Sequence, residues 1–334
     1  MPSYCPKDNR QPQRKNTAHG AALGWHGVCR TAAVDCHLMQ RLRDIRALLS
    51  AAGLKPRHRL GQNFLIDANL MNKLLATAEI DPDVPVLEVG PGTGSMTEML
   101  LERARRVVAV EVDAHLAELL AERLGSRGGF QLLRCDILAG KHEIAPQVLA
   151  ALGGRAQLVA NLPYNVATPL LAECLIQSWR AHRGDTGACL FEAMTVTIQR
   201  EVADRLCAKP GGRDYGPVSV LASLLGKITP GAILPPAAFW PAPKVHSQMV
   251  RIVFDAEAAG EVASIDVLKT VLSVCFAQRR KQIHSAGRRR GVPVGPEAFA
   301  KALAQAGIDP TLRPEHVGSD GFCALANALQ AILP

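Results

Sequence analysis

The stretch LEVGPGTG, residues 87–94, decides the fold of this chain. An apolar run precedes its glycines and a helical pattern follows them, so the stretch predicts a strand, a tight turn and a helix. Glycines let the backbone approach a ligand closely, and the first turn of a helix offers free N–H donors. A tight turn without a ligand is the alternative interpretation. Glu111 favours the interpretation with a ligand, because it ends the next apolar run, 21 residues after Gly90. An acid at this position reaches the two hydroxyls of a ribose.

Short apolar runs alternate with helical segments around this turn. We expect strands over residues 86–89, 107–112, 132–135, 158–160 and 188–197, and helices over 96–103, 114–123 and 169–179. This alternation predicts an α/β fold with a parallel, doubly wound, Rossmann-like sheet that helices cover on both faces.

Periodicity divides the chain into three parts. Residues 1–34 show no sustained pattern, so we expect a disordered, basic N-terminal extension. Residues 35–254 form the ligand-binding α/β domain, which begins with a helix from Leu38 to Leu49 and is interrupted by stretches rich in proline and glycine at 209–217 and 230–244. After a strand-like run at 249–254, residues 255–334 predict a small helical domain.

Positive charge gathers at the amino end. Residues 1–60 hold eleven lysines and arginines against three acids, whereas the remaining residues hold 27 of each sign. This excess favours an arm for an anionic partner, nucleic acid first, with a solvated tail or an organelle transit segment as the alternatives. A second cluster, Arg279–Lys281 with Arg288–Arg290, is either a phosphate clamp or a solvated helix face.

Composition excludes several classes of protein. The chain is 48% hydrophobic and 20% charged, which is typical of a soluble globular protein, and it has no apolar run long enough to span a membrane. Nine scattered cysteines without a C-x-x-C pair favour a reducing cytoplasm over a disulfide framework. The histidines and cysteines between residues 26 and 37 lack the spacing of a zinc finger, so we expect no metal.

Two nucleotide ligands compete for the glycine turn, a dinucleotide and S-adenosylmethionine. The dinucleotide pattern needs a third small residue, which Ser95 fills only loosely. The later strands discriminate between the two ligands. The third is expected to end at Asp136, where an acid accepts from an adenine amino group, and the fourth to end in NLPY, Asn161–Tyr164. An ordinary proline turn is the alternative interpretation of NLPY.

The NLPY tetrapeptide suits methylation of an amine on a planar ring. The exocyclic amine of adenine is a poor nucleophile, because its lone pair is donated into the ring. An Asn side-chain oxygen and a backbone carbonyl, placed on its two hydrogens, aim that lone pair at the methyl group of the cofactor. Proline fixes the turn that presents the carbonyl, and an aromatic ring stacks on the base. Positioning then supplies most of the rate, without a strong general base.

With these residues identified, the chain resembles the KsgA/RsmA family of ribosomal RNA adenine dimethyltransferases. The resemblance runs from about Leu60 to the carboxyl end. Besides LEVGPGTG, its motifs are GQNFLID (61–67), VVAVEVD (107–113), CDIL (135–138), NLPYNVATPLL (161–171), QREVADRL (199–206), FWPAPKVHS (239–247), FAQRRKQI (276–283) and GIDPTLRPEHVG (307–318).

The resemblance implies an S-adenosylmethionine-dependent enzyme that dimethylates the N6 amino groups of two adjacent adenosines in a hairpin near the 3′ end of 16S rRNA. It implies that the cofactor contacts Asn63, Leu65, Gly90, Glu111, Asp136 and Asn161. It implies that the target base contacts Asn161, the Leu162 carbonyl, Pro163, Tyr164 and Phe239. Asp113 is the alternative partner for the cofactor ribose.

The same resemblance implies a cytoplasmic, monomeric protein that acts on a precursor of the small ribosomal subunit during ribosome biogenesis, with neither a metal nor a membrane partner. Trp240 and His246 depart from the family pattern at the RNA-facing edge, and the first 35 or so residues match nothing in it.

Three other functions are the alternatives. A large-subunit RNA methyltransferase of the antibiotic-resistance type uses the same chemistry, but the long helical end, residues 265–334, favours the ribosome-assembly enzyme. A non-catalytic RNA-binding assembly factor is disfavoured by the intact NLPY motif. A nicotinamide-dependent dehydrogenase is disfavoured because no acid–base pair follows the nucleotide-binding half.

Overall fold

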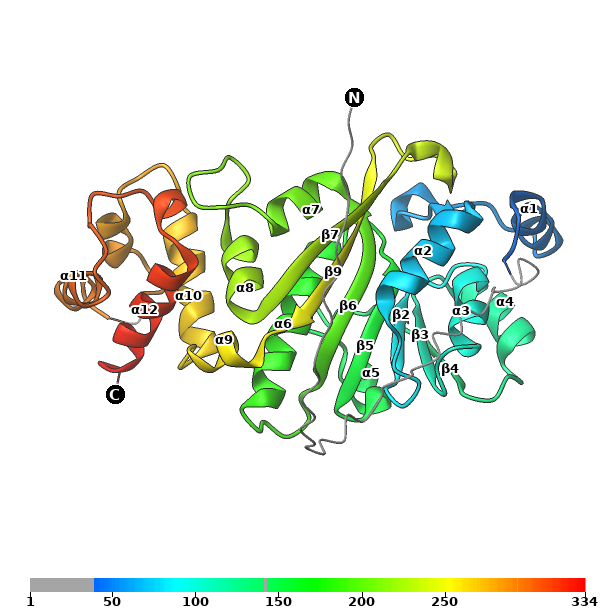
Figure 1. Cartoon of the computed structure of the whole chain (residues 1–334), viewed down its shortest axis with the longest axis horizontal. Helices are drawn as coiled ribbons and strands as arrows, with labels where there is room; N and C mark the ends of the chain where they lie inside the picture. Colours follow the sequence, from blue (N-terminus) through cyan, green and yellow to red (C-terminus); the bar gives the residue numbers. More distant parts are fainter. Residues whose placement is uncertain (1–38, 141–142, 293, 334) are drawn as a thin grey trace, which may run out of the picture. The chain divides into compact units, whose positions relative to one another are not determined.

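The structure, a computed structural model, describes residues 39–140, 143–292 and 294–333 (Figure 1). The predicted N-terminal extension, residues 1–34, and the histidines and cysteines between residues 26 and 37 lie outside this part of the chain. Within the described residues, no helix combines the length and the apolar character needed to cross a membrane.

A seven-stranded sheet forms the centre of the described chain, in the order β4-β3-β2-β5-β6-β9-β7. Its strands are β2 (Val86–Val89), β3 (Val107–Glu111), β4 (Phe130–Arg134), β5 (Arg155–Asn161), β6 (Leu190–Gln199), β7 (Gly226–Leu234) and β9 (Ser247–Phe254). The strands from β4 to β6 in this order pair in parallel, which confirms the predicted doubly wound core. By contrast, β9 pairs antiparallel with both β6 and β7.

Strand β7 passes through a segment in which the sequence predicts an interruption. Its Pro230 has no N–H to donate to a neighbouring strand. The proline is tolerated because β7 lies at the edge of the sheet and its register with β9 shifts between Pro230 and Ile233.

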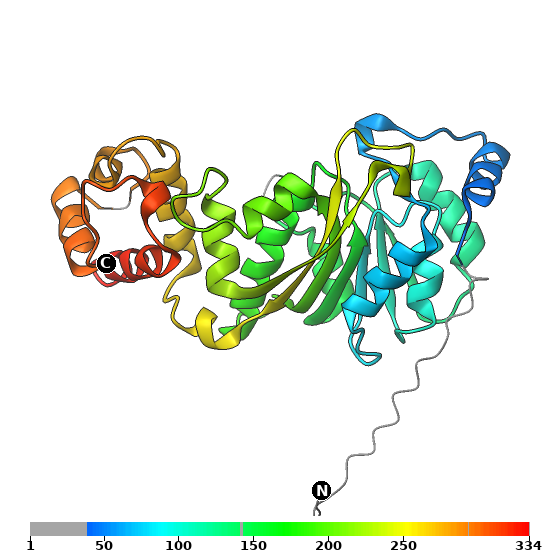
Figure 2. The ribbon, with the colours of Figure 1, turned by 45° about the horizontal axis from the view of Figure 1, so that its top comes forward.

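Helices cover both faces of the sheet (Figure 2). They are α1 (Leu42–Ala51), α2 (Ala68–Ala78), α3 (Ser95–Leu101), α4 (Ala114–Leu124), α5 (Pro146–Leu152), α6 (Ala167–His182), α7 (Arg200–Leu206), α8 (Pro217–Leu225), α9 (Ala256–Gly260), α10 (Ile265–Phe276), α11 (Pro296–Gln305) and α12 (Ser319–Gln330). Short 3-10 turns occupy His58–Leu60, Pro236–Ala238, Ile283–Arg288 and Pro314–His316.

Alternate residues of the central strands enter different layers of the core. On β2, Leu87 and Val89 pack in the cluster that includes α5, α6 and α8, whereas Val86 packs in the cluster that includes α2 and α3. This alternation follows from the two-residue period of a strand, and burial on both faces explains why the strands are nearly continuous apolar runs.

The C-terminal helices share an apolar core with the sheet domain. Leu268 of α10 and Leu325 of α12 belong to the same cluster as α6 and α8. Near the predicted boundary at residue 254, Trp179 of α6 donates its indole N–H to the carbonyls of Ala259 and Val262, both at 3.2 Å. The helical region is therefore firmly joined to the sheet, and its standing as a separate domain stays a prediction.

Candidate active site

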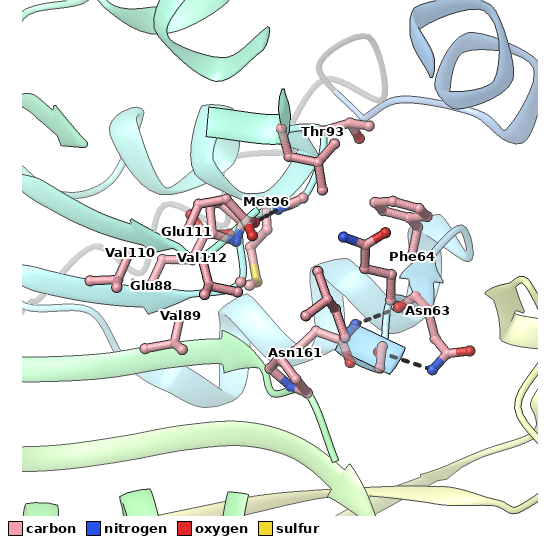
Figure 3. Close-up of a pocket in the computed structure, with 18 of the residues that line it drawn as sticks. Asn63, Phe64, Glu88, Val89, Thr93, Met96, Val110, Glu111, Val112 and Asn161 are labelled. Atoms are coloured by element: carbon pink, nitrogen blue, oxygen red, sulfur yellow. Dashed lines mark hydrogen bonds between the residues drawn. The ribbon is translucent and has the colours of Figure 1, made fainter. Parts of the chain in front are cut away.

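A cavity opens at the carboxyl ends of β2, β3, β4 and β5, which are neighbours in the sheet (Figure 3). Ligands of open α/β sheets bind at this edge. The predicted site residues that line the cavity are Asn63, Leu65, Gly90, Glu111, Asp136, Asn161 and Pro163. Asn63 of GQNFLID and Asn161 of NLPY, which are 98 positions apart in the sequence, therefore meet at one place.

Side chains from two other motifs pack directly against the glycine turn. Gly90 and Gly92 have φ values of 72° and 61°, in the left-handed region that favours glycine. A Cβ atom on Gly90 would lie 3.2 Å from Pro163 of NLPY, and one on Gly92 would lie 2.8 Å from Phe64 of GQNFLID. The glycines thus permit both the shape of the turn and the close approach of its neighbours.

Asn161 links NLPY to the GQNFLID segment. It is the last residue of β5, as predicted, and its Nδ2 donates to the backbone carbonyl of Asn63 at 2.9 Å. Asn63 in turn donates its own Nδ2 to the carbonyl of Gly61 at 3.1 Å. Figure 3 draws both bonds beside the cavity. Because the nitrogen of the Asn161 amide is used in this way, its Oδ1 is left to accept a hydrogen bond.

Two buried carboxyl groups line the same cavity. Glu111 ends β3 as predicted, and its oxygens accept from the backbone N–H of Asp113 at 2.9 Å and of Gly92 at 3.4 Å. Burial raises the pKa of Glu111 to about 7. Glu88 of β2 is 1% exposed, and among the described residues neither of its oxygens has a hydrogen-bond partner. Burial raises the pKa of Glu88 to about 8.

Asp113, the alternative ribose partner, is already engaged. Its Oδ1 accepts from the N–H of His115 at 3.1 Å and so caps the start of α4. Its Oδ2 accepts from Gln62 at 3.1 Å and lies 3.3 Å from the guanidinium of Arg57. Glu111 is therefore the better placed acid at the cavity, since Asp113 does not line it.

The residues predicted to hold the target base lie apart from the cavity lining, except for Asn161 and Pro163. Leu162 is 2% exposed, and its N–H bonds to the carbonyl of Thr197 at 3.1 Å. The Tyr164 hydroxyl lies 2.9 Å from Oγ of Ser247. Phe239 is 3% exposed in the core, in the short strand β8 (Phe239–Trp240).

Strand β8 pairs antiparallel with β1 (Phe64–Leu65), so that Leu65 is opposite Phe239. The segment predicted to contact the cofactor is therefore bonded to the one predicted to contact the base. The roles of Tyr164 and Phe239 stay predictions.

Several lining residues carried no assigned role in the sequence. Phe64, Glu88, Thr93 and Met96 all line the cavity and are labelled in Figure 3. Of these, only Glu88 gives a signal that sequence reasoning can use, because it is a lone acid inside an apolar strand.

The model of the family described as "Ribosomal RNA adenine dimethylase" matches residues 53–330. The chain belongs to this family. The enzyme class predicted from the sequence, an rRNA adenine dimethyltransferase, is thereby confirmed.

Two curated relatives are named "Ribosomal RNA small subunit methyltransferase A". The protein of Streptomyces griseus is 40% identical over 285 residues, which cover 85% of this chain and 92% of the relative. The protein of Geobacillus kaustophilus is 35% identical over 288 residues, which cover 85% of this chain and 94% of the relative.

Solved structures confirm the fold class, a Rossmann-like methyltransferase sheet. The 23S rRNA methyltransferase ErmE has a TM-score of 0.55 and 26% identity, covering 80% of this chain and 100% of that one. A dimethyladenosine transferase from Plasmodium falciparum has a TM-score of 0.60 and 22% identity, covering 78% of this chain and 95% of that one.

The buried Glu88 gives a prediction for stability against pH. Its pKa of about 8 in the folded protein lies above the ordinary value of 4.5, so folding favours the neutral carboxyl. The resulting stabilisation is present below pH 4.5 and is lost as the pH rises through about 8. We expect Glu88→Gln, which stays neutral, to melt at a higher temperature than the wild type at about pH 9 and to show a flatter pH profile.

Thermal unfolding followed by circular dichroism between about pH 6 and pH 9 checks this expectation. Glu122→Gln, at an exposed position on α4, is the matched control and should keep the wild-type profile. A Glu88→Gln profile that coincides with that of the control would contradict a buried, titrating Glu88.

Proposed function

We propose that this protein is an S-adenosylmethionine-dependent rRNA methyltransferase that dimethylates N6 of two adjacent adenosines in a hairpin near the 3′ end of 16S rRNA. The observation that carries the proposal is the junction of NLPY with the glycine turn, where Pro163 and Gly90 share one cavity. The small-subunit enzymes named above, at 35% and 40% identity, support this choice of RNA over the large-subunit alternative at 26%.

The cavity suits a cationic nucleoside. The carboxyl oxygens of Glu88 have no partner among the described residues, and Glu111 lies in the same lining. A positively charged ligand lowers the cost of ionising such buried acids, whereas the pyrophosphate of a dinucleotide would face them with like charge. The residues present therefore fit S-adenosylmethionine, which when bound supplies a methyl group on a sulfonium that an amine can accept.

We propose the cofactor contacts at the positions predicted from the sequence. The methionine end would be held by Asn63, which directly precedes β1, by Leu65 of β1 and by Gly90 of the glycine turn. Glu111 would accept from the ribose hydroxyls, and a carboxylate makes these charge-assisted bonds strong. Asp136, which follows β4 and lines the cavity, would accept from the adenine amino group.

The target amine would be held at the end of β5. Asn161 Oδ1 and the Leu162 carbonyl accept its two hydrogens, and Pro163 fixes the turn between them. The flipped adenine would stack on Tyr164, whose hydroxyl is hydrogen-bonded to Ser247, and on Phe239. Because Phe239 is 3% exposed in the structure, its stacking requires a rearrangement that uncovers its ring.

The helical region, residues 255–334, would grip the RNA through phosphates. A hollow between it and α7 is lined by Arg205, Arg213, Arg279, Arg280 and Arg313, with Asp214 and Glu315 as its acids. Arg279 is engaged within the protein, since it bonds to Glu315 and to the carbonyl of Arg213, both at 2.9 Å. Arg280 and Lys281 are exposed and so remain for phosphate.

A precursor of the small ribosomal subunit is the partner that this proposal implies. The six described cysteines are free thiols, in keeping with a reducing cytoplasm, and the enzyme would act there as a monomer during ribosome biogenesis.

Methylation mapping tests the function directly. Purified protein, labelled S-adenosylmethionine and small subunits lacking the modification should yield N6,N6-dimethyladenosine at two adjacent positions of 16S rRNA. Asn161→Ala should lose about a hundredfold or more in rate at saturating cofactor, because an acceptor that acts at the transition state is removed. Label in large-subunit RNA instead, or a wild-type rate for Asn161→Ala, would contradict the proposal.

The RNA grip gives a second prediction. Arg280→Gln with Lys281→Gln should weaken binding to the small subunit, and each lost phosphate contact should lower the slope of log affinity against log salt by about 0.7–0.9. Cofactor affinity should not change. The control is Lys73→Gln with Arg105→Gln, which removes the same charge from two exposed positions outside the hollow and outside residues 255–334. Filter binding at several salt concentrations measures this slope. Equal slopes for the two double variants would exclude Arg280 and Lys281 as phosphate contacts.

A further inference from the structure

Gln40, just before α1, is hydrogen-bonded to the glycine turn. It is 7% exposed, and its Nε2 donates to the carbonyl of Thr93 at 3.1 Å. The Thr93 hydroxyl donates back to Oε1 of Gln40 at 2.7 Å. The backbone N–H of Gln40 also reaches Oγ of Ser95, at 3.3 Å. The side chain of Gln40 therefore bonds both the carbonyl and the hydroxyl of Thr93, the residue at the centre of the turn.

A second side chain donates to the same carbonyl. Arg123 of α4 donates to the carbonyl of Thr93 and pairs with Glu98 of α3 at 2.9 Å. Thr93 is 1% exposed and lines the cofactor cavity between two glycines. Glycines on both sides leave the free turn with many backbone conformations, so an ordered turn depends on bonds such as these.

Helix α1 holds Gln40 in place. Ile45 and Leu49 of α1 are 0% and 3% exposed and pack on Leu116 and Leu119 of α4, and α1 lies beside α4 in Figures 1 and 2. Ile45 also lines the cofactor cavity. The match to the family model begins at residue 53, after this helix. The contacts of α1 are therefore additional to the motifs on which family membership rests.

We propose that Gln40 is a positioning residue for the cofactor. By bonding the carbonyl and the hydroxyl of Thr93, it fixes the turn from Gly92 to Gly94 in its ligand-binding shape before the cofactor arrives. This raises the affinity for the cofactor, because the turn already loses its conformational freedom when the protein folds, and that loss of entropy is then not charged to binding. Gln40 does not line the cavity, so its side chain acts through Thr93. This inference rests on the proposed role of the cavity as the S-adenosylmethionine site.

The test is Gln40→Met, which keeps the length and volume of the side chain but removes both of its bonds to Thr93. We expect the Kd for S-adenosylmethionine, measured by calorimetry, to rise by about tenfold or more, which corresponds to the loss of two hydrogen bonds. KM for the cofactor should rise by the same factor. Turnover at saturating cofactor should stay within about twofold of the wild type, since the transfer step is untouched.

Two further variants separate positioning from general stability. Arg43→Met, on the exposed side of α1, is the matched control and should leave Kd and KM unchanged. Gln40→Glu keeps an acceptor for the Thr93 hydroxyl but, once ionised, faces the Thr93 carbonyl without a proton. Its loss of affinity relative to the wild type should therefore grow as the pH rises, which a purely structural defect would not produce. If Gln40→Met does not fold, this variant carries the test.

The outcomes distinguish this inference from the proposed function. A wild-type protein that is folded but binds no S-adenosylmethionine would overturn the cofactor assignment itself. A wild type that binds, with Gln40→Met binding equally well, would overturn only the role of Gln40. A loss of turnover at saturating cofactor with KM unchanged would also contradict it.

Discussion

The site depends on how closely other segments approach the glycine turn. Pro163 of NLPY and Phe64 of GQNFLID lie within contact distance of where Cβ atoms on Gly90 and Gly92 would stand. Any side chain at those two positions would push the neighbouring loops outward. The two glycines therefore set the spacing between GQNFLID, the segment proposed to hold the methyl donor, and NLPY, the segment proposed to hold its acceptor. This spacing matters because the proposed reaction depends on positioning of the two reactants.

Two buried acids in the cavity lining, Glu88 and Glu111, are the basis of the ligand selectivity that we propose. Glu88 and Glu111 are held where water solvates them poorly, so each keeps its proton to a higher pH than an exposed acid. A cation or a set of hydroxyl donors bound in the cavity would lower the free energy needed to ionise these two acids. Asp113, two residues after Glu111, instead caps α4 and accepts a hydrogen bond from Gln62. Two nearby acids thus have different tasks because their partners differ.

The sequence predicts much of this architecture, because buried parallel strands leave a clear pattern. Val86–Val89 is a strand as expected, and Asn161 and Glu111 end their strands as expected. Helix α2 is absent from the predicted elements, although Asp67 caps it and its buried residues, Met71, Leu74, Leu75 and Ala78, recur at helical spacing. Strand β7 is absent because Pro230 argues against a strand until its edge position is known.

The site is less predictable where long-range contacts decide it. Gln40 and Thr93 are separated by 53 positions, and no local pattern joins them. Phe239 is aromatic and lies in a recognisable motif, yet it is 3% exposed in a core cluster with Leu234 and Met249. Sequence motifs thus identify which residues gather at the cavity, whereas the packing between elements decides which of them face it.

Calorimetric titration of the wild-type protein with S-adenosylmethionine, and separately with NAD⁺, tests the central claim most directly. The claim is that the glycine turn, Glu88 and Glu111 form one cavity for a cationic nucleoside. It predicts a single S-adenosylmethionine bound per chain, with no detectable heat from NAD⁺ at the same concentrations. Binding of NAD⁺ that S-adenosylmethionine displaces, or a folded protein that binds only NAD⁺, would contradict it.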